Sequence, residues 1–187
     1  MKQNRQTEES EPINWRQEII SWILIIIAAA AIAFVLNNFI IANSKVPSGS
    51  METTIMTGDR VIGSRLTYHF KDPERGDIAI FHFPDDTTGK IFYVKRIIGL
   101  PGDTIDIVNG KVYLNGSDTP LDEPYIQEEM IPEPPAHYEV PEDSYFMMGD
   151  NRNHSADARR WTNTYVSRDK IIAKVLFRYF PSIGKIE

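Results

Sequence analysis

The sequence predicts a mainly β domain preceded by one N-terminal transmembrane helix. Two observations carry this prediction: a long apolar run near the N-terminus, and a series of short apolar runs separated by glycine and proline turns further along the chain. A run of about 18 apolar residues has the length of a bilayer-crossing helix, whereas runs of about four to eight residues between turns are typical of strands. The short runs do not alternate with long helical patterns, which disfavours a parallel βαβ arrangement.

Size and composition fit one globular domain with an appendage. The chain has 187 residues, of which 42% are hydrophobic and 25% charged, as in ordinary folded proteins. Because 26 acidic residues outnumber 20 basic ones, the net charge is -6, and we predict no nucleic acid partner. The chain has no cysteine, which excludes disulfides, thiol nucleophiles and thiolate metal sites.

The apolar run covers residues 19–36 and contains Ser21 as its only clearly polar residue. As a helix it would be about 27 Å long, close to the thickness of the hydrocarbon core of a bilayer. Beyond an Asn-Asn pair the sequence FIIA extends the apolar stretch, so we predict a transmembrane signal anchor over residues 19–42. Two alternatives fit less well, because a buried core helix would carry a polar stripe and a cleaved signal would have a shorter apolar region.

Basic residues on either side of the anchor indicate its orientation. Three lysines or arginines precede the apolar run, and two follow within about 20 residues of its end. Cytoplasmic flanks carry the excess of positive charge. The pattern therefore favours a cytoplasmic tail of residues 1–18 and an extracytoplasmic domain of residues 43–187, in a single-pass protein.

Turn residues divide the predicted domain into short strands. The Asn109-Gly110 pair between two apolar runs predicts a tight hairpin. Prolines and acidic residues are frequent over residues 118–143, which we interpret as a long surface excursion and not as a second domain. The expected strands lie around residues 61–62, 77–81, 91–98, 104–108, 111–114 and 171–180.

Two serines flank a glycine shortly after the anchor, in the sequence VPSGSMET of residues 46–53. Gly49 allows the backbone to be approached closely, and Ser50 could present its hydroxyl group together with its own N–H. Serines beside glycine and proline are also ordinary turn residues. By itself this segment therefore leaves two interpretations open, a nucleophile or a turn.

Lys95 lies in the middle of a predicted strand with apolar residues at alternating positions on both faces. A lysine in a strand that is buried on both sides loses water, which lowers its pKa and favours the neutral amine. A neutral amine can serve as a general base. The alternative is an edge strand in which Lys95 and Arg96 face solvent, and the pattern alone leaves both possibilities open.

A polar stretch, MGDNRNHSADAR over residues 148–159, offers many local hydrogen bonds. Its acidic residues lack the spacing of an EF-hand, and the four histidines of the chain are not paired at metal-ligand spacing. We therefore predict no metal and no cofactor.

Together these segments resemble the bacterial type I signal peptidases, membrane-bound serine proteases that remove signal peptides. The matching stretches, in order, are the anchor, PSGSMETTIMTGDRV, RGDIAIF, YVKRIIGLPGD and MGDNRNHSADAR, and the small size resembles the Gram-positive members. The resemblance implies a largely antiparallel β-sheet or partial barrel for the catalytic domain. It also implies a bacterial cell membrane location, with signal peptides of exported preproteins and the lipid bilayer as partners.

The resemblance assigns a role to each matching residue. Ser50 would be the nucleophile and Lys95 its general base, while the hydroxyl of Ser48 and the N–H of Ser50 would form the oxyanion hole. Support for the dyad would come from Ser155, which would hold the Lys95 amine in position, and from Asp157 and Arg159, which would pair and fix their loop. Pockets for small side chains at positions −3 and −1 of the substrate would involve Val46, Met51, Tyr93, Val94 and Ala156.

Two rival functions are set against this interpretation. A non-catalytic anchored protein of the same fold would bind exported chains without turnover. A self-cleaving repressor-type protease would share the Ser–Lys chemistry but should carry an N-terminal helix-turn-helix, where this chain has its apolar run. The sequence also departs from the family pattern at Thr53, Ala158 and Arg160, and it predicts no oligomeric state.

Overall fold

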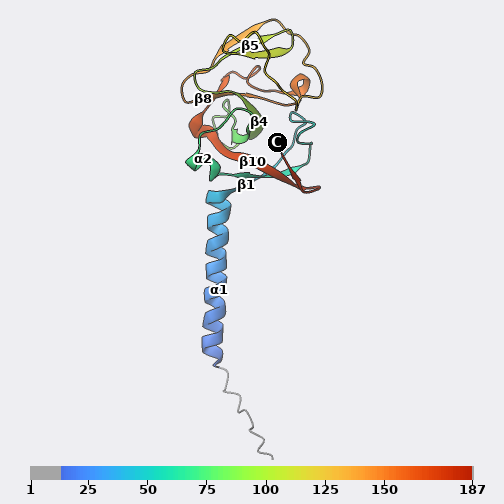
Figure 1. Ribbon diagram of the computed structural model, residues 1–187. Coiled ribbons are helices and arrows are strands. Elements are labelled where there is room, and N and C mark those ends of the chain that lie inside the picture. Colours follow the sequence, from blue (N-terminus) through green and yellow to red (C-terminus); the bar gives the residue numbers. More distant parts are fainter. Residues whose placement is uncertain (1–13, 187) are drawn as a thin grey trace, which may run out of the picture. The chain divides into compact units, whose positions relative to one another are not determined.

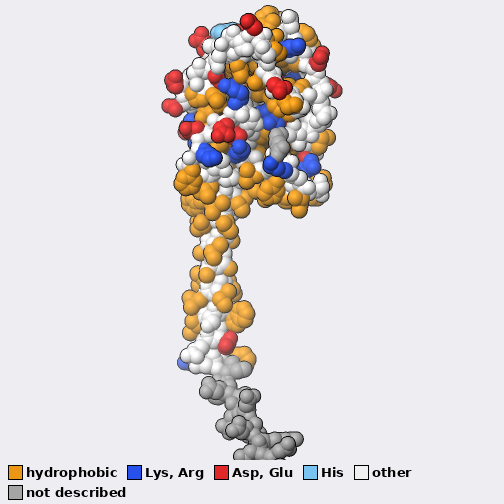
Figure 2. All heavy atoms as spheres, in the orientation of Figure 1, with side chains coloured by type: hydrophobic (Ala, Val, Ile, Leu, Met, Phe, Trp, Pro, Cys, Tyr) orange, Lys and Arg blue, Asp and Glu red, His pale blue; other side chains and the backbone are white. Residues whose placement is uncertain are grey.

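The protein is described by a computed structural model over residues 14–186, in two compact units that adjoin in sequence at Asn37 and Asn38. The first unit consists of helix α1 (Trp15–Val35), which runs into a π-helical turn, η1 (Leu36–Ile40) (Figure 1). No residue of α1 is buried, and exposed apolar side chains cover the helix in Figure 2. By length and composition this helix can cross a membrane.

The ends of the helix differ from the predicted anchor of residues 19–42. Helix α1 begins at Trp15, so the last residues of the predicted tail 1–18 are helical, and the tail up to residue 13 lies outside the described residues. Ile41 and Ala42 open strand β1 (Ile41–Lys45), and Ala42 is buried. The apolar pattern could not show where the helix ends and β1 begins, because membrane helices and core strands are both rich in apolar side chains.

The second unit is built from antiparallel strands. Its large sheet has the order β1-β2-β10-β3-β4-β8-β9, with β11 paired to β10, and its small sheet has the order β6-β5-β7. The large sheet curls into an open partial barrel, most visibly along β10 in Figure 1, which confirms the expected fold class. After β1 its elements are β2 (Arg60–Ser64), α2 (Thr67–Phe70), β3 (Ile78–His82), β4 (Phe92–Gly99), β5 (Thr104–Val108), β6 (Lys111–Leu114), β7 (Ala136–Glu139), β8 (Ser144–Met148), η2 (Arg152–His154), β9 (Tyr165–Ser167), η3 (Arg168–Lys170), β10 (Ile171–Phe180) and β11 (Gly184–Lys185).

Two apolar clusters cover opposite faces of the large sheet. Strand β3 shows this directly, because Ala79 and Phe81 belong to one cluster whereas Ile78 and Ile80 belong to the other. Successive side chains of a strand point to opposite faces. Strand β4 pairs with β3 on one side and β8 on the other, so it lies inside the sheet. The polar side chains of Lys95 and Arg96 on β4 are buried in consequence.

The predicted hairpin is confirmed, and the predicted excursion is corrected in part. Asn109 and Gly110 have φ values of 49° and 72° and join β5 to β6, as a two-residue hairpin turn requires. Within residues 118–143, which we interpreted from the sequence as a long surface excursion, strand β7 pairs with β5, although no strand was predicted there. The flanking prolines concealed it, because four residues are too few to display a period of two.

Three segments of the second unit meet at one place. The connection between β1 and β2 carries Ser48 and Ser50, strand β4 carries Lys95, and the connection after β8 carries residues 149–159. The first connection is closed by backbone hydrogen bonds from Val46 N to Asp59 O (2.9 Å) and from Gly58 N to Val46 O (2.8 Å). These bonds join the two ends of the loop that carries the serines.

Candidate active site

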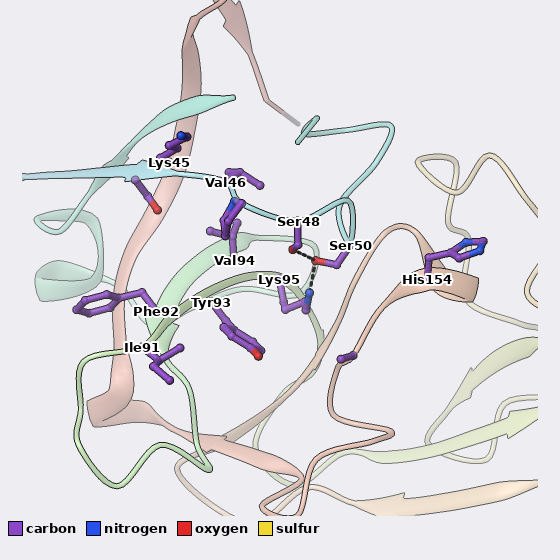
Figure 3. A pocket seen from close by; sticks show the side chains of 13 residues that line it. Lys45, Val46, Ser48, Ser50, Ile91, Phe92, Tyr93, Val94, Lys95 and His154 are labelled. Carbon is purple, nitrogen blue, oxygen red and sulfur yellow. Dashed lines mark hydrogen bonds between the residues drawn. The ribbon is translucent and has the colours of Figure 1, made fainter. Parts of the chain in front are cut away.

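Ser50 and Lys95, 45 positions apart in the chain, are in contact in the fold. Nζ of Lys95 is hydrogen-bonded to Oγ of Ser50, and both residues are buried (Figure 3). A serine hydroxyl within hydrogen-bond reach of a basic nitrogen is the arrangement from which an activated nucleophile is made. The pair can therefore carry covalent chemistry on a carbonyl substrate.

The surroundings of Lys95 favour its neutral form. Burial lowers the pKa of Lys95 from 10.5 to about 8, although the carboxylates of Asp157 and Asp150 favour the charged form and reduce the shift. Only 3% of its surface is exposed. With this pKa roughly one tenth of the Lys95 amine is unprotonated at pH 7 and about half at pH 8, and the lone pair of this neutral form can accept a proton.

The edge-strand alternative for Lys95 and Arg96 is wrong. Strand β4 is an interior strand, in which Lys95 faces Ala79 of β3 and Arg96 faces Met148 of β8. Both side chains are buried, each at 3% exposure. Apolar residues occupy both odd and even positions around Lys95, so both faces of the strand carry them. This pattern correctly indicated that the strand is buried on both faces.

The loop that carries the two serines is held by Asn151. Its side-chain Nδ2 donates to Gly49 O (3.0 Å), and its backbone N donates to Ser50 O (3.2 Å). Within the loop, Oγ of Ser48 lies 3.3 Å from Oγ of Ser50. A second hydroxyl thus sits beside the candidate nucleophile, where it can donate to an oxygen bound there.

The connection after β8 is ordered around Asp157 and Arg159. Nε of Arg159 donates to Asp157 Oδ1 (2.8 Å), and Gly149 N donates to Asp157 Oδ2 (3.1 Å). Burial raises the pKa of the Asp157 carboxyl, but Arg159 and the Gly149 N–H outweigh it and hold that pKa below its ordinary value. The carboxylate therefore stays charged, and the expected Asp157–Arg159 pair is present.

Ser155 is close to the dyad, but its expected contact with Lys95 is not formed. Oγ of Ser155 is buried and is not hydrogen-bonded to Lys95. A side chain at Gly149 would collide with both Ser155 Oγ and the carbonyl oxygen of Ser50. The space between the serine loop and Ser155 is thus too narrow for any residue but glycine at position 149.

A cavity of about 390 Å³ opens beside the dyad (Figure 3). It is lined by four of the five residues expected to bind substrate, and Met51 is the exception. Met51 is fully buried in the apolar cluster under the serine loop, so it supports the loop and does not face the cavity. The lining residues are Ser44, Lys45, Val46, Pro47, Ser48, Ser50, Ile91, Phe92, Tyr93, Val94, Lys95, His154 and Ala156.

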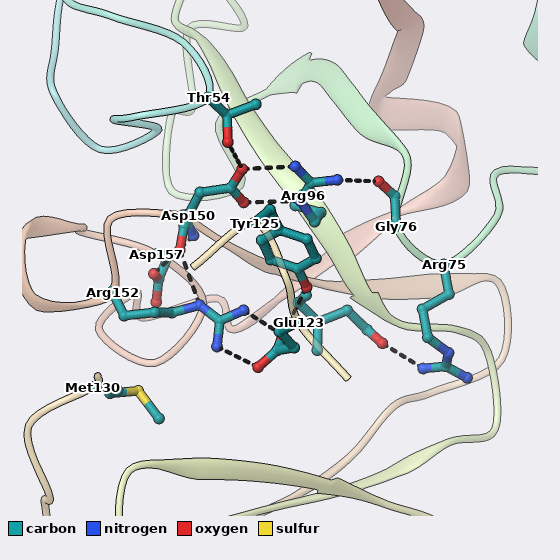
Figure 4. A network of polar contacts seen from close by, with 12 residues as sticks. Thr54, Arg75, Gly76, Arg96, Glu123, Tyr125, Met130, Asp150, Arg152 and Asp157 are labelled. Carbon is teal, nitrogen blue, oxygen red and sulfur yellow. Dashed lines mark hydrogen bonds and ion pairs between the residues drawn. The ribbon is translucent and has the colours of Figure 1, made fainter. Parts of the chain in front are cut away.

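A buried ion pair next to Lys95 was not identified from the sequence. Arg96 donates from Nε to Asp150 Oδ1 (2.9 Å) and from Nη2 to Asp150 Oδ2 (2.7 Å), and Oγ1 of Thr54 donates to the same carboxylate (2.6 Å) (Figure 4). The pair connects β4, the serine loop and the connection after β8. The Gly-Asp-Asn-Arg turn suggested local hydrogen bonds, but no sequence signal relates Asp150 to Arg96.

No group of three or more potential metal ligands comes together within residues 14–186. Where Ser50 meets Lys95, the site presents hydroxyl and amine groups. A cavity with small and apolar walls, a buried amine and an activated hydroxyl fit nucleophilic attack on an extended peptide.

Comparison with known proteins points in the same direction. A family model described as "Signal peptidase, peptidase S26" matches residues 19–180. "Probable signal peptidase I-2" of Synechocystis sp. is 36% identical over 188 residues, which covers 97% of this chain and 81% of the relative. "Signal peptidase I S" of Bacillus subtilis is 31% identical over 183 residues, which covers 92% of this chain and 95% of the relative. A solved structure of a signal peptidase I from Enterococcus faecalis is 29% identical, with a TM-score of 0.46, and covers 56% of this chain and 97% of that one.

Proposed function

The chain belongs to the signal peptidase family, peptidase S26, and from that premise we propose that Ser50 and Lys95 form the catalytic dyad of a membrane-anchored endopeptidase that cleaves signal peptides from exported preproteins. The observation that carries the proposal is the hydrogen bond between the buried Lys95 amine and the Ser50 hydroxyl. A serine peptidase needs a base for its nucleophile, and no histidine is hydrogen-bonded to Ser50 among the described residues.

The reaction proceeds in two steps. Neutral Lys95 takes the hydroxyl proton of Ser50 as Oγ attacks the scissile carbonyl carbon, and the resulting tetrahedral oxyanion accepts hydrogen bonds from the N–H of Ser50 and the hydroxyl of Ser48. The ammonium of Lys95 then returns the proton to the leaving amine as the C–N bond breaks. In the second step Lys95 takes a proton from a water as this water attacks the ester carbonyl carbon. It returns the proton to Oγ of Ser50 as the ester C–O bond breaks, which releases the acid product and regenerates the free enzyme.

The cavity supports a preference for small residues at positions −3 and −1 of the substrate. Val46, Tyr93, Val94 and Ala156 line it, and its volume of about 390 Å³ is shared by the whole bound segment. A bulky side chain next to the scissile bond would displace the carbonyl carbon from Ser50, and a misplacement of about 1 Å can cost about 100-fold in rate.

Replacing alanine by phenylalanine at position −1 of a preprotein is expected to reduce kcat/KM for its cleavage by at least about 100-fold. Mass spectrometry of the products after incubation with the full-length protein in detergent or vesicles measures both the rate and the bond that is cut. The same replacement at position −2 is the matched control and should change kcat/KM by less than about threefold. Equal cleavage of the −1 variant would contradict the proposed substrate preference.

The membrane helix gives the proposed enzyme its location. We place the N-terminus in the cytoplasm and residues 43–187 outside the membrane, on the charge pattern around the apolar run. Anchoring keeps the site near the membrane surface where exported chains emerge, which raises their effective concentration. The non-catalytic binder of the same fold is the alternative, and preprotein binding without turnover by the wild-type chain would select it.

The proposed base predicts a pH profile. Because Lys95 must be neutral to accept the serine proton and its pKa is about 8, kcat/KM should fall about tenfold for each pH unit below about 8 and level off above it. The slope is positive because the protonated, inactive form dominates at low pH. Initial rates of preprotein cleavage between about pH 5 and 10 measure this, and a flat profile down to pH 5 would rule Lys95 out as the base.

A further inference from the structure

The irregular segment before β7 contacts the buried ion pair beside the dyad. The ring of Tyr125 covers one face of the Arg96 guanidinium, with 3.8 Å between Cζ and the ring centroid (Figure 4). The N–H groups at the edge of the same guanidinium donate hydrogen bonds to Asp150 and, from Nη1, to Gly76 O (2.8 Å). Tyr125 thus covers one face of a guanidinium whose Nε, Nη1 and Nη2 each donate a hydrogen bond.

A second contact of this segment reaches the connection after β8. Glu123 accepts from Nη1 of Arg152 at Oε2 (3.0 Å) and from Nη2 at Oε1 (2.5 Å), and Nε of Arg152 donates to Gly149 O (3.1 Å). The hydroxyl of Tyr125 donates to Glu123 Oε1 (2.7 Å). Burial, followed by the negative charge of Glu123, raises the pKa of the Tyr125 phenol, so it remains a donor.

The two contacts end on the immediate neighbours of the reacting groups. Arg96 follows Lys95 in β4, and Gly149 packs against the carbonyl oxygen of Ser50 and the hydroxyl of Ser155. Asp150 lies between them and also binds Thr54 of the serine loop. Residues 121–126 are called the strap here. The strap therefore contacts both β4, which carries Lys95, and the connection after β8, which packs against the serine loop.

We propose that Tyr125 and Glu123 of the strap are positioning residues for the dyad, because they fix Arg96 and Arg152 and keep water away from the strand that carries Lys95. This inference rests on the proposed function. Neither side chain touches the substrate cavity, so both act through their neighbours. Loss of the strap contacts should loosen the Ser50–Lys95 geometry and let water approach the amine, whose pKa would then move up toward its ordinary value.

Three strap variants of the full-length protein test the inference. Tyr125→Leu is expected to lower kcat by about tenfold with KM within about twofold, and to shift the rising limb of the pH–rate profile to higher pH. Tyr125→Phe retains the ring over Arg96 and should restore kcat to within about threefold of wild type. Glu123→Gln should also lower kcat and shift the rising limb of the pH–rate profile to higher pH, with both effects smaller than in Tyr125→Leu.

Tyr113→Leu on β6 and Glu128→Gln in the same irregular segment are the matched controls and should behave as wild type. The folded fraction of every variant is measured by circular dichroism, so that kcat refers to folded protein. An unshifted pH limb with wild-type kcat in Tyr125→Leu overturns the proposal, and if that variant does not fold, the same result in Glu123→Gln overturns it. Failure of the wild-type chain to cleave any preprotein would instead reject the proposed function.

Discussion

Replacing Ser50 by alanine is expected to lower kcat for preprotein cleavage by about 10⁴-fold or more, and Lys95→Met should do the same. In the proposed mechanism Ser50 supplies the oxygen that forms the covalent intermediate, and Lys95 is the group hydrogen-bonded to it that would take its proton. Because the two act as one unit, the double variant should be hardly slower than either single variant. Single-turnover cleavage of a preprotein by the full-length protein measures all three rates.

Matched controls separate this loss from general damage. Ser117→Ala in the loop after β6 and Lys90→Met before β4 change exposed residues of the same types and should leave kcat unchanged. Substrate binding is expected to survive in Ser50→Ala, with KM or Kd within a few-fold of wild type, since the cavity walls are intact. Retention of even one tenth of the wild-type rate in either dyad variant would refute the assignment of the dyad.

The fold should tolerate the loss of Lys95. In the folded protein this lysine releases its proton near pH 8, whereas in the unfolded chain it holds the proton up to about pH 10.5. The unfolded state therefore binds more protons between these values, so the buried amine lowers the free energy of unfolding below pH 8, and this penalty is lost as the pH rises toward 10.5. Lys95→Met should accordingly be at least as stable as wild type at neutral pH, which is the usual relation between a buried catalytic group and stability.

Local patterns in the sequence predicted those features that local chemistry determines. The Asn109-Gly110 hairpin follows from the positive φ values that only such residues adopt readily. The apolar residues on both sides of Lys95 were compatible with the interior position of β4, but the sequence pattern alone left an edge strand open as well. The antiparallel fold and the roles of Ser50 and Lys95 came from the resemblance to a family. Their contact is a property of the fold and not of any single segment.

The features that the sequence did not predict depend on long-range contacts. Asp150 binds Arg96 from a position 54 residues away, and Asn151 holds Gly49 across 102 residues. A buried acid in a polar turn has the same local sequence as an exposed one. For the same reason Met51 was expected in the cavity, although its side chain points into the core beneath the serine loop.

Breaking the Arg96–Asp150 pair is expected to destabilise the fold strongly. The side chains of Arg96 and Asp150 are 3% and 0% exposed and are joined by two hydrogen bonds. Removing one partner leaves the other charge buried and uncompensated, which typically costs about 3–5 kcal/mol. Asp150→Leu should thus lower the melting temperature of the full-length protein by about 10 °C or more, as measured by calorimetry in detergent.

The double variant Arg96→Met/Asp150→Leu removes both charges, whereas Asp150→Leu leaves the Arg96 charge buried without its partner. Comparing the two variants separates the effect of the unpaired charge from the effect of losing the ion pair itself. Because paired charges also pay for desolvation, replacing both by apolar side chains should recover much of the stability lost in Asp150→Leu. Arg160→Met is the control, since Arg160 pairs with Glu133 at the surface, where both side chains are about half exposed and such a pair contributes at most about 1 kcal/mol.

The double variant should nevertheless cleave slowly. Asp150 also binds Thr54 of the serine loop, and Arg96 is fixed to Gly76 O as well, so apolar replacements restore packing without restoring the polar contacts that align Ser50 with Lys95. Stability that recovers while kcat stays at least about tenfold below wild type would assign the pair to alignment of the site. Recovery of both together would mean that the pair serves only the fold, and a melting temperature unchanged in Asp150→Leu would contradict its burial.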